Sequence, residues 1–303
     1  MISSQPRASN SLRIIVILGP TASGKSDLAV FLAKKFGGEV VSADSRQVYK
    51  GLDIGTGKIT KREMGGVPHH LLDIASPKKQ ISVSQYQQKA EKTIRDIIAR
   101  GKLPIVIGGS GMYIDAILYG APYPEVPPNR KLRARLEKKT AEALFQELQK
   151  KDPARAETID RHNKRRLVRA LEIIAATGKP VPPLEKTPRY APLILGVLRT
   201  KKELEKRIKT RLHARLKGGM IGEAKKLLAA GISHKRLYEL GLEYRYLSEF
   251  LRKKISRAEL AQELAHAIKQ YAKRQMTWFR QYPQTRWIKT RAAAQKEVTR
   301  FLK

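Results

Sequence analysis

The hydrophobic positions of the first 120 residues alternate between short apolar runs and helical periodicity. Apolar runs with the length of a buried strand lie at 13–18, 39–42 and 103–107. Amphipathic patterns with the period of a helix lie at 24–36, 84–100 and 112–118. Strands that alternate with helices form parallel sheets with helices on both faces. We therefore predict an α/β core.

The pattern changes at Ala121. A proline-rich stretch, APYPEVPPN, precedes helical patterns at 130–151 and at 164–177, the second with Gly178 as its C-cap. A second such stretch, KPVPPLEKTP, is followed by a strand pattern at 193–198, helical patterns over 201–274 and an edge strand at 285–288. This order predicts an all-helical insertion domain at 121–192, within a core made of 1–120 and 193–303.

Basic residues far outnumber acidic ones. The chain has 62 Lys and Arg against 27 Asp and Glu, a net charge of +35, and about half of the excess lies after residue 200. Such a field favours a polyanionic partner, and nucleic acid is the first candidate. The alternative is that the basic residues lie on solvated helix faces and bind no polyanion.

Composition removes several other classes of protein. Cysteine is absent, which excludes disulfides, a catalytic thiol and thiolate zinc sites, and the six histidines lack the spacing of metal ligands. No apolar run approaches the length of a membrane span, and residues 1–11 lack the apolar core of a signal peptide. We therefore expect a cytoplasmic protein that does not enter a membrane.

The turn after the first strand has the pattern G-x-x-x-x-G-K-S. It consists of Gly19, Pro20, Thr21, Ala22, Ser23, Gly24, Lys25 and Ser26. Glycines let backbone N–H groups face an anion, and the helix that follows adds its positive N-terminal dipole. Lys25 is expected to reach the phosphates and the Ser26 hydroxyl to ligate Mg²⁺. We predict a phosphate site on a P-loop NTPase-like sheet.

A P-loop phosphotransferase usually has a second carboxylate at the end of an apolar strand, where it holds Mg²⁺. The strand at 103–107 ends instead in Gly-Gly-Ser-Gly. The nearest acid is Asp44, which follows the strand at 39–42 and lies at the carboxyl edge of the sheet, where open α/β sheets bind ligands. From the residues alone, Asp44 is equally a group for chemistry beside the phosphates and a capping residue of a turn.

Several motifs together resemble one known family. GPTASGKS is followed by SADSRQVYKGLDIGTGK (42–58), PHHLLDIASP (68–77), IVIGGSGMYIDAIL (105–118), KRRLVRALEI (164–173) and YAKRQMTWFR (271–280). In content and order they resemble tRNA dimethylallyltransferases over nearly the whole chain, from residue 13 to 288. The resemblance implies transfer of a dimethylallyl group from dimethylallyl diphosphate to N6 of adenine 37, in the anticodon loop of tRNAs reading codons that begin with U. It also implies a monomer.

The resemblance also implies roles for single residues. The phosphate loop, with Mg²⁺, would hold the diphosphate of dimethylallyl diphosphate, and Arg211 would pair with that diphosphate. Asp44 would accept a hydrogen bond from the adenine amino group and act as the general base. Ser110 stands where the family usually has threonine and keeps the hydroxyl, so a catalytic role is expected for it as well.

Contacts with tRNA are implied along the whole chain. They are expected from Asp44, Ser45, Arg46, Gln47, Ser110, Arg133, Arg165, Arg166, Arg169, Tyr244 and Arg245. The last two belong to GLEYR, which departs from the family's usual GY-R core. The residues alone leave open whether Tyr244, Trp278 and Phe279 stack on bases or pack in the core, and they favour the core.

Three alternatives remain at this point. An adenylate isopentenyltransferase would act on free AMP, ADP or ATP and would not need the helical insertion or the basic last third. A nucleotide-kinase-like phosphotransferase would need the missing strand-end carboxylate. A nucleic-acid-binding P-loop protein without catalysis would leave Asp44 beside the loop unexplained.

Overall fold

The computed structural model describes residues 12–120, 123–183 and 187–303. The chain divides into two compact units, one formed by Met1–Gly120 with Pro188–Lys303 and the other by Ala121–Thr187. The insertion unit therefore ends at Thr187, whereas the sequence pattern predicted that it would end at residue 192. The reason is local: the Arg189 N–H donates to the Leu118 carbonyl at 2.8 Å and the Ala191 N–H to the Leu12 carbonyl at 3.1 Å, which ties this segment to the core.

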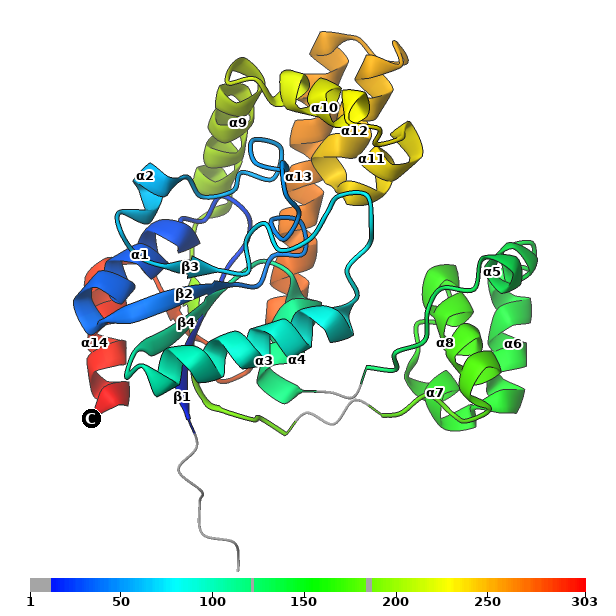
Figure 1. The fold of residues 1–303 in the computed structure, drawn as a ribbon, viewed down its shortest axis with the longest axis horizontal. Helices are drawn as coiled ribbons and strands as arrows, with labels where there is room; N and C mark the ends of the chain where they lie inside the picture. Colours follow the sequence, from blue (N-terminus) through cyan, green and yellow to red (C-terminus); the bar gives the residue numbers. More distant parts are fainter. Residues whose placement is uncertain (1–11, 121–122, 184–186) are drawn as a thin grey trace, which may run out of the picture. The chain divides into compact units, whose positions relative to one another are not determined.

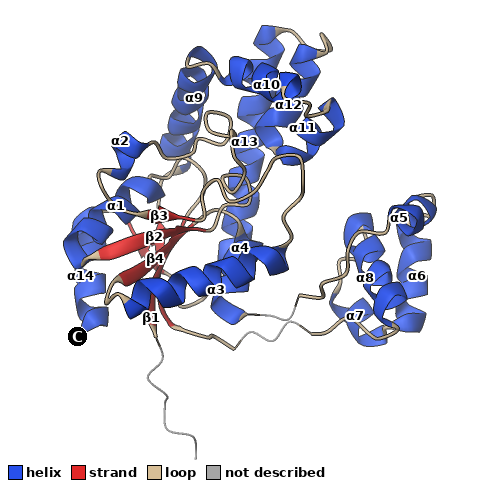
Figure 2. Cartoon of the chain, in the orientation of Figure 1, coloured by secondary structure: helices blue, strands red, loops and turns tan. Residues whose placement is uncertain are grey.

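One sheet of parallel strands organises the core unit (Figures 1 and 2). Its order is β3-β2-β4-β1-β5-β6. The strands are β1 (Arg13–Leu18), β2 (Gly38–Ser42), β3 (His69–His70), β4 (Leu103–Ile107), β5 (Ala191–Val197) and β6 (Arg286–Ile288). The predicted P-loop NTPase-like α/β class is confirmed. The short strand β3 was not predicted, because two histidines carry no strand pattern.

Helices cover both faces of the sheet, as the continuous apolar strands require. Alternate residues of β1 point to opposite faces. Ile14 and Val16 pack with α3 (Val83–Ala99) and α4 (Gly111–Tyr119), whereas Ile15 and Ile17 pack with α1 (Lys25–Phe36) and α14 (Arg291–Leu302). All four of these β1 side chains are fully buried.

The helices of the basic last third follow β5, and most of them lie beyond the carboxyl ends of the strands (Figure 1). Those before β6 are α9 (Lys201–Lys217), α10 (Met220–Ala229), α11 (His234–Leu240), α12 (Leu242–Leu251) and α13 (Arg257–Phe279). A further short helix, α2 (Lys61–Met64), was not predicted; a capping box between Thr60 and Glu63 starts it. Parallel strands bring their carboxyl-end loops to one edge, so the phosphate loop and the segments after β2 and β4 meet there.

The insertion unit is a small helical bundle with its own core. It contains α5 (Arg130–Leu136), α6 (Ala141–Lys151), α7 (Pro153–Thr158) and α8 (Lys164–Thr177), which ends at Gly178 as predicted. The single helix expected at 130–151 is wrong, because Thr140 accepts a hydrogen bond from the Ala143 N–H and starts a new helix. Leu136, Leu144, Leu148, Leu167 and Leu171 form the core of this unit.

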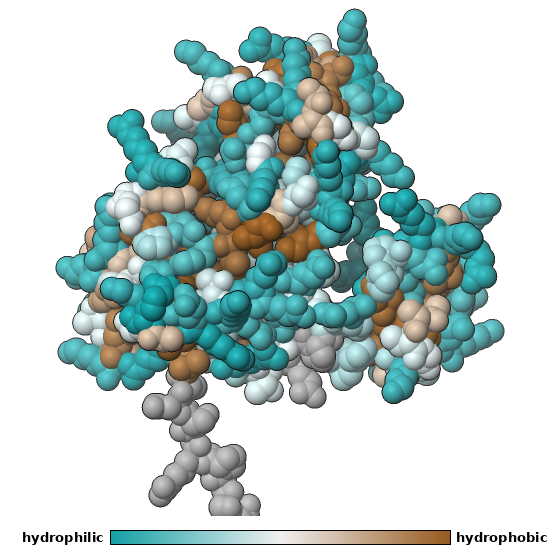
Figure 3. Space-filling view, viewed as in Figure 1, coloured by the Kyte–Doolittle hydropathy of each residue, from teal (hydrophilic) through white to brown (hydrophobic). Residues whose placement is uncertain are grey.

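The surface is predominantly hydrophilic in both units, and a group of hydrophobic residues shows near the centre of the core unit (Figure 3). Among the helices of the described residues, none is long and apolar enough to cross a bilayer.

Candidate active site

The phosphate loop turns tightly between β1 and α1. Gly19 has φ 152° and Gly24 has φ 96°, both conformations that favour glycine. A Cβ built on Gly19 would lie 2.8 Å from the Ser23 Oγ, so the loop also lacks room for a side chain there. Gly24 is the N-cap of α1 and provides no side-chain cap. The first N–H groups of α1 are therefore presented to an anion rather than capped by the protein.

Lys25 lies where the sequence places the phosphate-binding lysine. Its Nζ donates to the Pro20 carbonyl at 2.9 Å, which folds the side chain back over the loop. Burial, and then repulsion by Arg211, lower the pKa of Lys25 to about 8, while the negative charge of Asp44 opposes this shift. Arg211 and Asp44 therefore both act on Lys25, although the three residues come from three different segments.

Three arginines, spaced four residues apart, lie along α9. The Arg207 Nε donates to the Ala22 carbonyl at 2.7 Å and the Arg215 Nη1 to the Gly55 carbonyl at 2.8 Å. Arg211, between them, has no hydrogen bond or ion pair among the described residues. Desolvation, followed by repulsion from Arg215 and Arg207, lowers the pKa of Arg211. An anion at this point would relieve the repulsion.

Two arginines donate hydrogen bonds to the phosphate loop, and the sequence did not predict either of them. Arg207 holds Ala22, as described, and the Arg199 Nε donates to the Ser23 carbonyl at 3.1 Å. The Nη2 atoms of both guanidinium groups lie close to Gly24. The spacing of Arg207 and Arg211 on one helical face is a signal that could have identified Arg207; Arg199 lies before the helix and carries no such signal.

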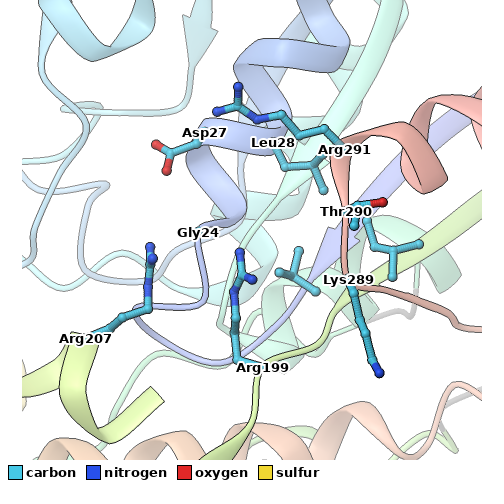
Figure 4. A pocket seen from close by; sticks show the side chains of 10 residues that line it. Gly24, Asp27, Leu28, Arg199, Arg207, Lys289, Thr290 and Arg291 are labelled. Carbon is cyan, nitrogen blue, oxygen red and sulfur yellow. The ribbon is translucent and has the colours of Figure 1, made fainter. Parts of the chain in front are cut away.

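A cavity of about 100 Å³ lies beside the loop (Figure 4). Arg207 of α9 and Arg199 after β5 line it together with Lys289 and Arg291 near the start of α14, and Asp27 is its only acidic lining residue. The positive side of the loop thus extends beyond the predicted motif.

Asp44 starts the turn after β2. Its Oδ1 accepts the N–H groups of Arg46 at 2.8 Å and Gln47 at 3.3 Å, so the capping role is real. Its Oδ2 has no partner among the described residues. The Ser110 Oγ accepts the Ser45 N–H at 3.0 Å and contacts the Ser45 Oγ at 3.1 Å. Ser110 therefore fixes the segment that carries Asp44, and one carboxylate oxygen remains available for a substrate.

Three tyrosines lie near enough to this carboxylate to feel its charge. The rings of Tyr86 and Tyr113 stack with centroids 3.8 Å apart. Burial raises the pKa of Tyr86, Tyr113 and Tyr271, and the negative charge of Asp44 adds to the shift in each of them. A hydrogen bond with Ser110 acts in the opposite direction on the pKa of Tyr271. These phenols are therefore neutral, and they give Asp44 an aromatic environment that the sequence reasoning did not anticipate.

The active site offers few protein ligands for a metal ion. Among the described residues, no group of three or more His, Asp or Glu side chains could hold an ion. Ser26 is exposed in the first turn of α1, and its hydroxyl has no partner among those residues. Mg²⁺ is commonly bound through one or two protein oxygens together with substrate phosphates and water. The residues present fit that pattern of binding and not a site built from protein alone.

Tyr244 does not lie where a tRNA contact requires. Its side chain is 0% exposed, and its hydroxyl donates to the Glu223 Oε1 at 2.6 Å. The same carboxylate accepts the backbone N–H groups of Asp53, Ile54 and Gly55. The expected contact of Tyr244 with tRNA is therefore wrong. The ring is buried in the core, and its hydroxyl shares the Glu223 carboxylate with three backbone amides of a loop.

Arg245, its neighbour, remains partly exposed and lies over the ring of Tyr238, 4.3 Å from the centroid. Tyr238 is 46% exposed. Arg46 is also exposed, and its Nη1 donates to the Glu239 carbonyl at 2.9 Å. These side chains form a basic and aromatic surface on the core unit.

In the insertion unit, a buried acid engages two of the four predicted arginines. Glu172 is 1% exposed and binds Arg133 and Arg169, each at 2.6 Å. Both arginines are 36% exposed, but they share an ion pair with this one carboxylate, which the expectation of a tRNA contact had not foreseen. Arg165 and Arg166 are exposed in the first turn of α8 and carry no such pairing.

The remaining aromatic residues of α13 pack inside the core unit. Phe279 is 0% exposed. Trp278 is partly exposed and lies so close to Gly111 that a Cβ there would come within 2.2 Å of its ring. For these two residues, the core reading favoured by the sequence is confirmed.

Comparisons with known proteins place the chain in a family. The family model described as IPP transferase matches residues 47–282, which is more than half of the chain. The chain belongs to the IPP transferase family. Among the relatives in this family, a tRNA dimethylallyltransferase of a Thermoanaerobacter species is 38% identical and covers 92% of each chain. Another, from Geotalea daltonii, is 45% identical over 88% of this chain and 86% of its own.

Solved structures in the IPP transferase family have the same fold. A tRNA isopentenylpyrophosphate transferase of Bacillus halodurans is 38% identical, covers 91% of this chain and 89% of its own, and superimposes with a TM-score of 0.69. A eukaryotic dimethylallyltransferase described as acting on tRNA is 30% identical, covers 89% of this chain and 70% of its own, and has a TM-score of 0.75.

Proposed function

We propose that the chain transfers a dimethylallyl group from dimethylallyl diphosphate to N6 of adenine 37, in tRNAs that read codons beginning with U. The products are N6-(dimethylallyl)adenosine in tRNA and diphosphate. The related proteins named above are tRNA dimethylallyltransferases. The observation that carries the proposal in this chain is the unpartnered Oδ2 of Asp44, whose charge acts on Lys25 of the phosphate loop. A proton acceptor and a phosphate site therefore belong to one active site.

In this reaction the N6 amine forms a bond to C1 of the dimethylallyl group, and the bond from C1 to the diphosphate oxygen breaks. The diphosphate leaves with the electron pair, so negative charge grows there. Lys25, Arg211 and the loop amides stabilise that charge. Ser26 would hold Mg²⁺, which would supply positive charge to the leaving group.

The amine is a weak nucleophile and must lose a proton. Asp44 is placed to orient N6 through a hydrogen bond and to accept its proton at Oδ2. The turn amides fix the other oxygen, Oδ1, so the carboxylate is held in one orientation. The adenine must leave its stack to reach this partly exposed carboxylate. The tyrosines around Asp44 would shield the base from water.

Contacts with tRNA are assigned to basic side chains that are exposed or partly exposed. On the core unit these are Arg46 and Arg245, and on the insertion they are Arg165 and Arg166. Such contacts to phosphates position the RNA and weaken as salt rises. Arg133 and Arg169 would act mainly through Glu172, by holding the insertion in shape.

The test offers labelled dimethylallyl diphosphate and Mg²⁺ with unmodified tRNA that has A36-A37-A38 in its loop, and in parallel with AMP, ADP and ATP. Label in tRNA alone, mapped to adenine 37, is the expected result. Label in the free nucleotides would assign the chain to the adenylate-modifying class instead.

A variant tests the role of Asp44. Asp44→Asn keeps the Oδ1 acceptor for the turn amides but cannot take a proton. We expect turnover to fall by about 100- to 10,000-fold, the usual contribution of a general base, with tRNA affinity unchanged. Asp96→Asn is the control, because Asp96 is 64% exposed on α3 in a surface ion pair with Arg100. Turnover of Asp44→Asn within a few-fold of wild type would exclude Asp44 as the base.

A further inference from the structure

Gln275 joins two loops of the active site from inside the protein. It lies on α13 and is 5% exposed. Its Oε1 accepts the Thr21 N–H of the phosphate loop at 2.8 Å, and its Nε2 donates to the Gly109 carbonyl at 2.9 Å. The two partners are 254 and 166 residues away in the sequence. One amide thus uses its acceptor on one loop and a donor on the other.

These two loops carry the two halves of the site. Thr21 belongs to the loop assigned to the donor diphosphate. Gly109 precedes Ser110, which holds Ser45 and so the segment of Asp44. The side chain of Gln275 therefore connects the phosphate loop to the loop that holds the segment of Asp44.

The packing around Gln275 leaves little freedom. A Cβ on Gly109 would lie 2.2 Å from the Gln275 Nε2, so only glycine lets the loop approach this closely. Gly111, two residues on, is pressed against Trp278 of the same helix in the same way. Since α13 contacts the loop at two points one turn apart, the helix is a rigid support against which Gln275 sets the loops.

We propose that Gln275 is a positioning residue that fixes the phosphate loop relative to the loop carrying Ser110, and so sets the distance between the allylic carbon and the attacking amine. This inference rests on the proposed function. A small displacement of reacting groups costs a large factor in rate, and about 100-fold per ångström is typical.

The amide is required because it combines a donor and an acceptor. Methionine has a similar length and volume but supplies neither group. A glutamate carboxylate accepts the Thr21 N–H but meets the Gly109 carbonyl with a second acceptor, which is repulsive. A protonated glutamic acid has one O–H donor and one acceptor, so it restores both hydrogen bonds.

The first experiment measures kcat, the KM for dimethylallyl diphosphate and the Kd for tRNA in Gln275→Met. We expect kcat to fall by roughly 10- to 100-fold, with tRNA affinity within about twofold of wild type. Wild-type kinetic constants in this variant would overturn the proposal. Wild-type enzyme is assayed in parallel, and its failure to modify tRNA would instead refute the proposed function.

The second experiment separates positioning from simple stability. The ratio of the activity of Gln275→Glu to that of wild type is measured from about pH 8 down to about pH 5.5, because burial raises the pKa of a carboxyl into this range. The titratable groups on the surrounding elements are Lys25, Asp44, Tyr113 and Tyr271. They are present in both proteins, so taking the ratio removes the pH dependence that the two proteins share.

We expect the ratio to rise at least tenfold as pH falls, because the protonated side chain regains its donor. Gln262→Glu is the matched control: it adds the same charge at an exposed position of the same helix, and its ratio should stay flat. A flat ratio for Gln275→Glu would overturn the proposal. This result decides the question even if Gln275→Met does not fold.

Discussion

Replacing Tyr244 with phenylalanine removes a single hydroxyl from the buried junction of α12, α10 and the segment after β2. In the native protein this hydroxyl donates to the Glu223 Oε1 at 2.6 Å, and the ring lies against Gly55, where a Cβ would come within 2.6 Å. Glu223 keeps its three backbone donors in the variant. The change therefore tests one hydrogen bond to a charged, partly buried acceptor.

The expected loss follows from that bond. A hydrogen bond to a charged group contributes about 1.5–3 kcal/mol to the free energy of unfolding. For a unit of more than 200 residues, each kcal/mol lowers the melting temperature by about 2–4 °C. We therefore expect Tyr244→Phe to melt about 3–12 °C lower than wild type. Because the ring is fully buried, tRNA affinity should not change.

The assay combines thermal unfolding with a tRNA binding titration. Tyr238→Phe is the control, since Tyr238 is 46% exposed and its hydroxyl has no partner among the described residues. It should leave the melting temperature unchanged. Weaker tRNA binding by Tyr244→Phe at an unchanged melting temperature would refute the reasoning, because it would mean that the hydroxyl meets RNA rather than Glu223.

Three further predictions address the donor site and the insertion. Arg211→Ala should raise the KM for dimethylallyl diphosphate roughly 10- to 100-fold, because a charge-assisted contact with the diphosphate is lost. Lys217→Ala, at an exposed position of the same helix, is the control. An equal loss of tRNA affinity would make Arg211 an RNA contact. Because protonated Lys25 binds diphosphate and its pKa is about 8, affinity for dimethylallyl diphosphate should fall above that pH in a binding titration, and a flat profile up to about pH 9.5 would contradict this assignment. Glu172→Ala should destabilise the insertion by about 3 kcal/mol, measured by hydrogen exchange in α5 and α8, while exposed Glu157→Ala should not.

The insertion should also loosen in acid, and the sign follows from the buried carboxylate. Burial opposes the ionisation of Glu172, but hydrogen bonds from Arg133 and Arg169 outweigh it, so the pKa of Glu172 is lowered. A folded pKa below the unfolded one means that this stabilisation is present above the unfolded value and is lost as pH falls through the folded value. The protection of α8 amides, meaning exchange relative to the intrinsic rate at each pH, should therefore fall in acid in wild type and depend less on pH in Glu172→Ala.

Local sequence was sufficient for the core strands and the phosphate loop. The apolar runs of β1 and β4 are short, bounded by polar or glycine residues, and buried in the structure, so their pattern alone predicts their place. The loop from Gly19 to Ser26 depends on glycine conformations and on the helix that begins at Lys25, all of which are local. The same holds for Asp44, whose place after β2 puts it at the carboxyl edge of the sheet.

Tertiary structure decided which of the remaining residues meet substrate and which meet protein. Tyr244, Arg133 and Arg169 have side chains of the kinds that contact RNA. In the structure, however, Tyr244 binds Glu223, which is 21 residues away. Arg133 and Arg169 bind Glu172, which is 39 and 3 residues away. The sequence does not show this, because a charge or an aromatic ring looks the same whether its partner is RNA or a buried carboxylate.

Gln275 is the clearest case. Nothing around it in YAKRQMTWF distinguishes it from a solvated helix residue, and its two partners lie on loops far away in the sequence. The sequence by itself determined the fold class, the geometry of the phosphate loop and the place of Asp44 at the edge of the sheet, since each depends on hydrophobic period or backbone conformation within a few residues. The pairing of buried donors and acceptors depends on how distant segments pack, so only the folded chain determined it.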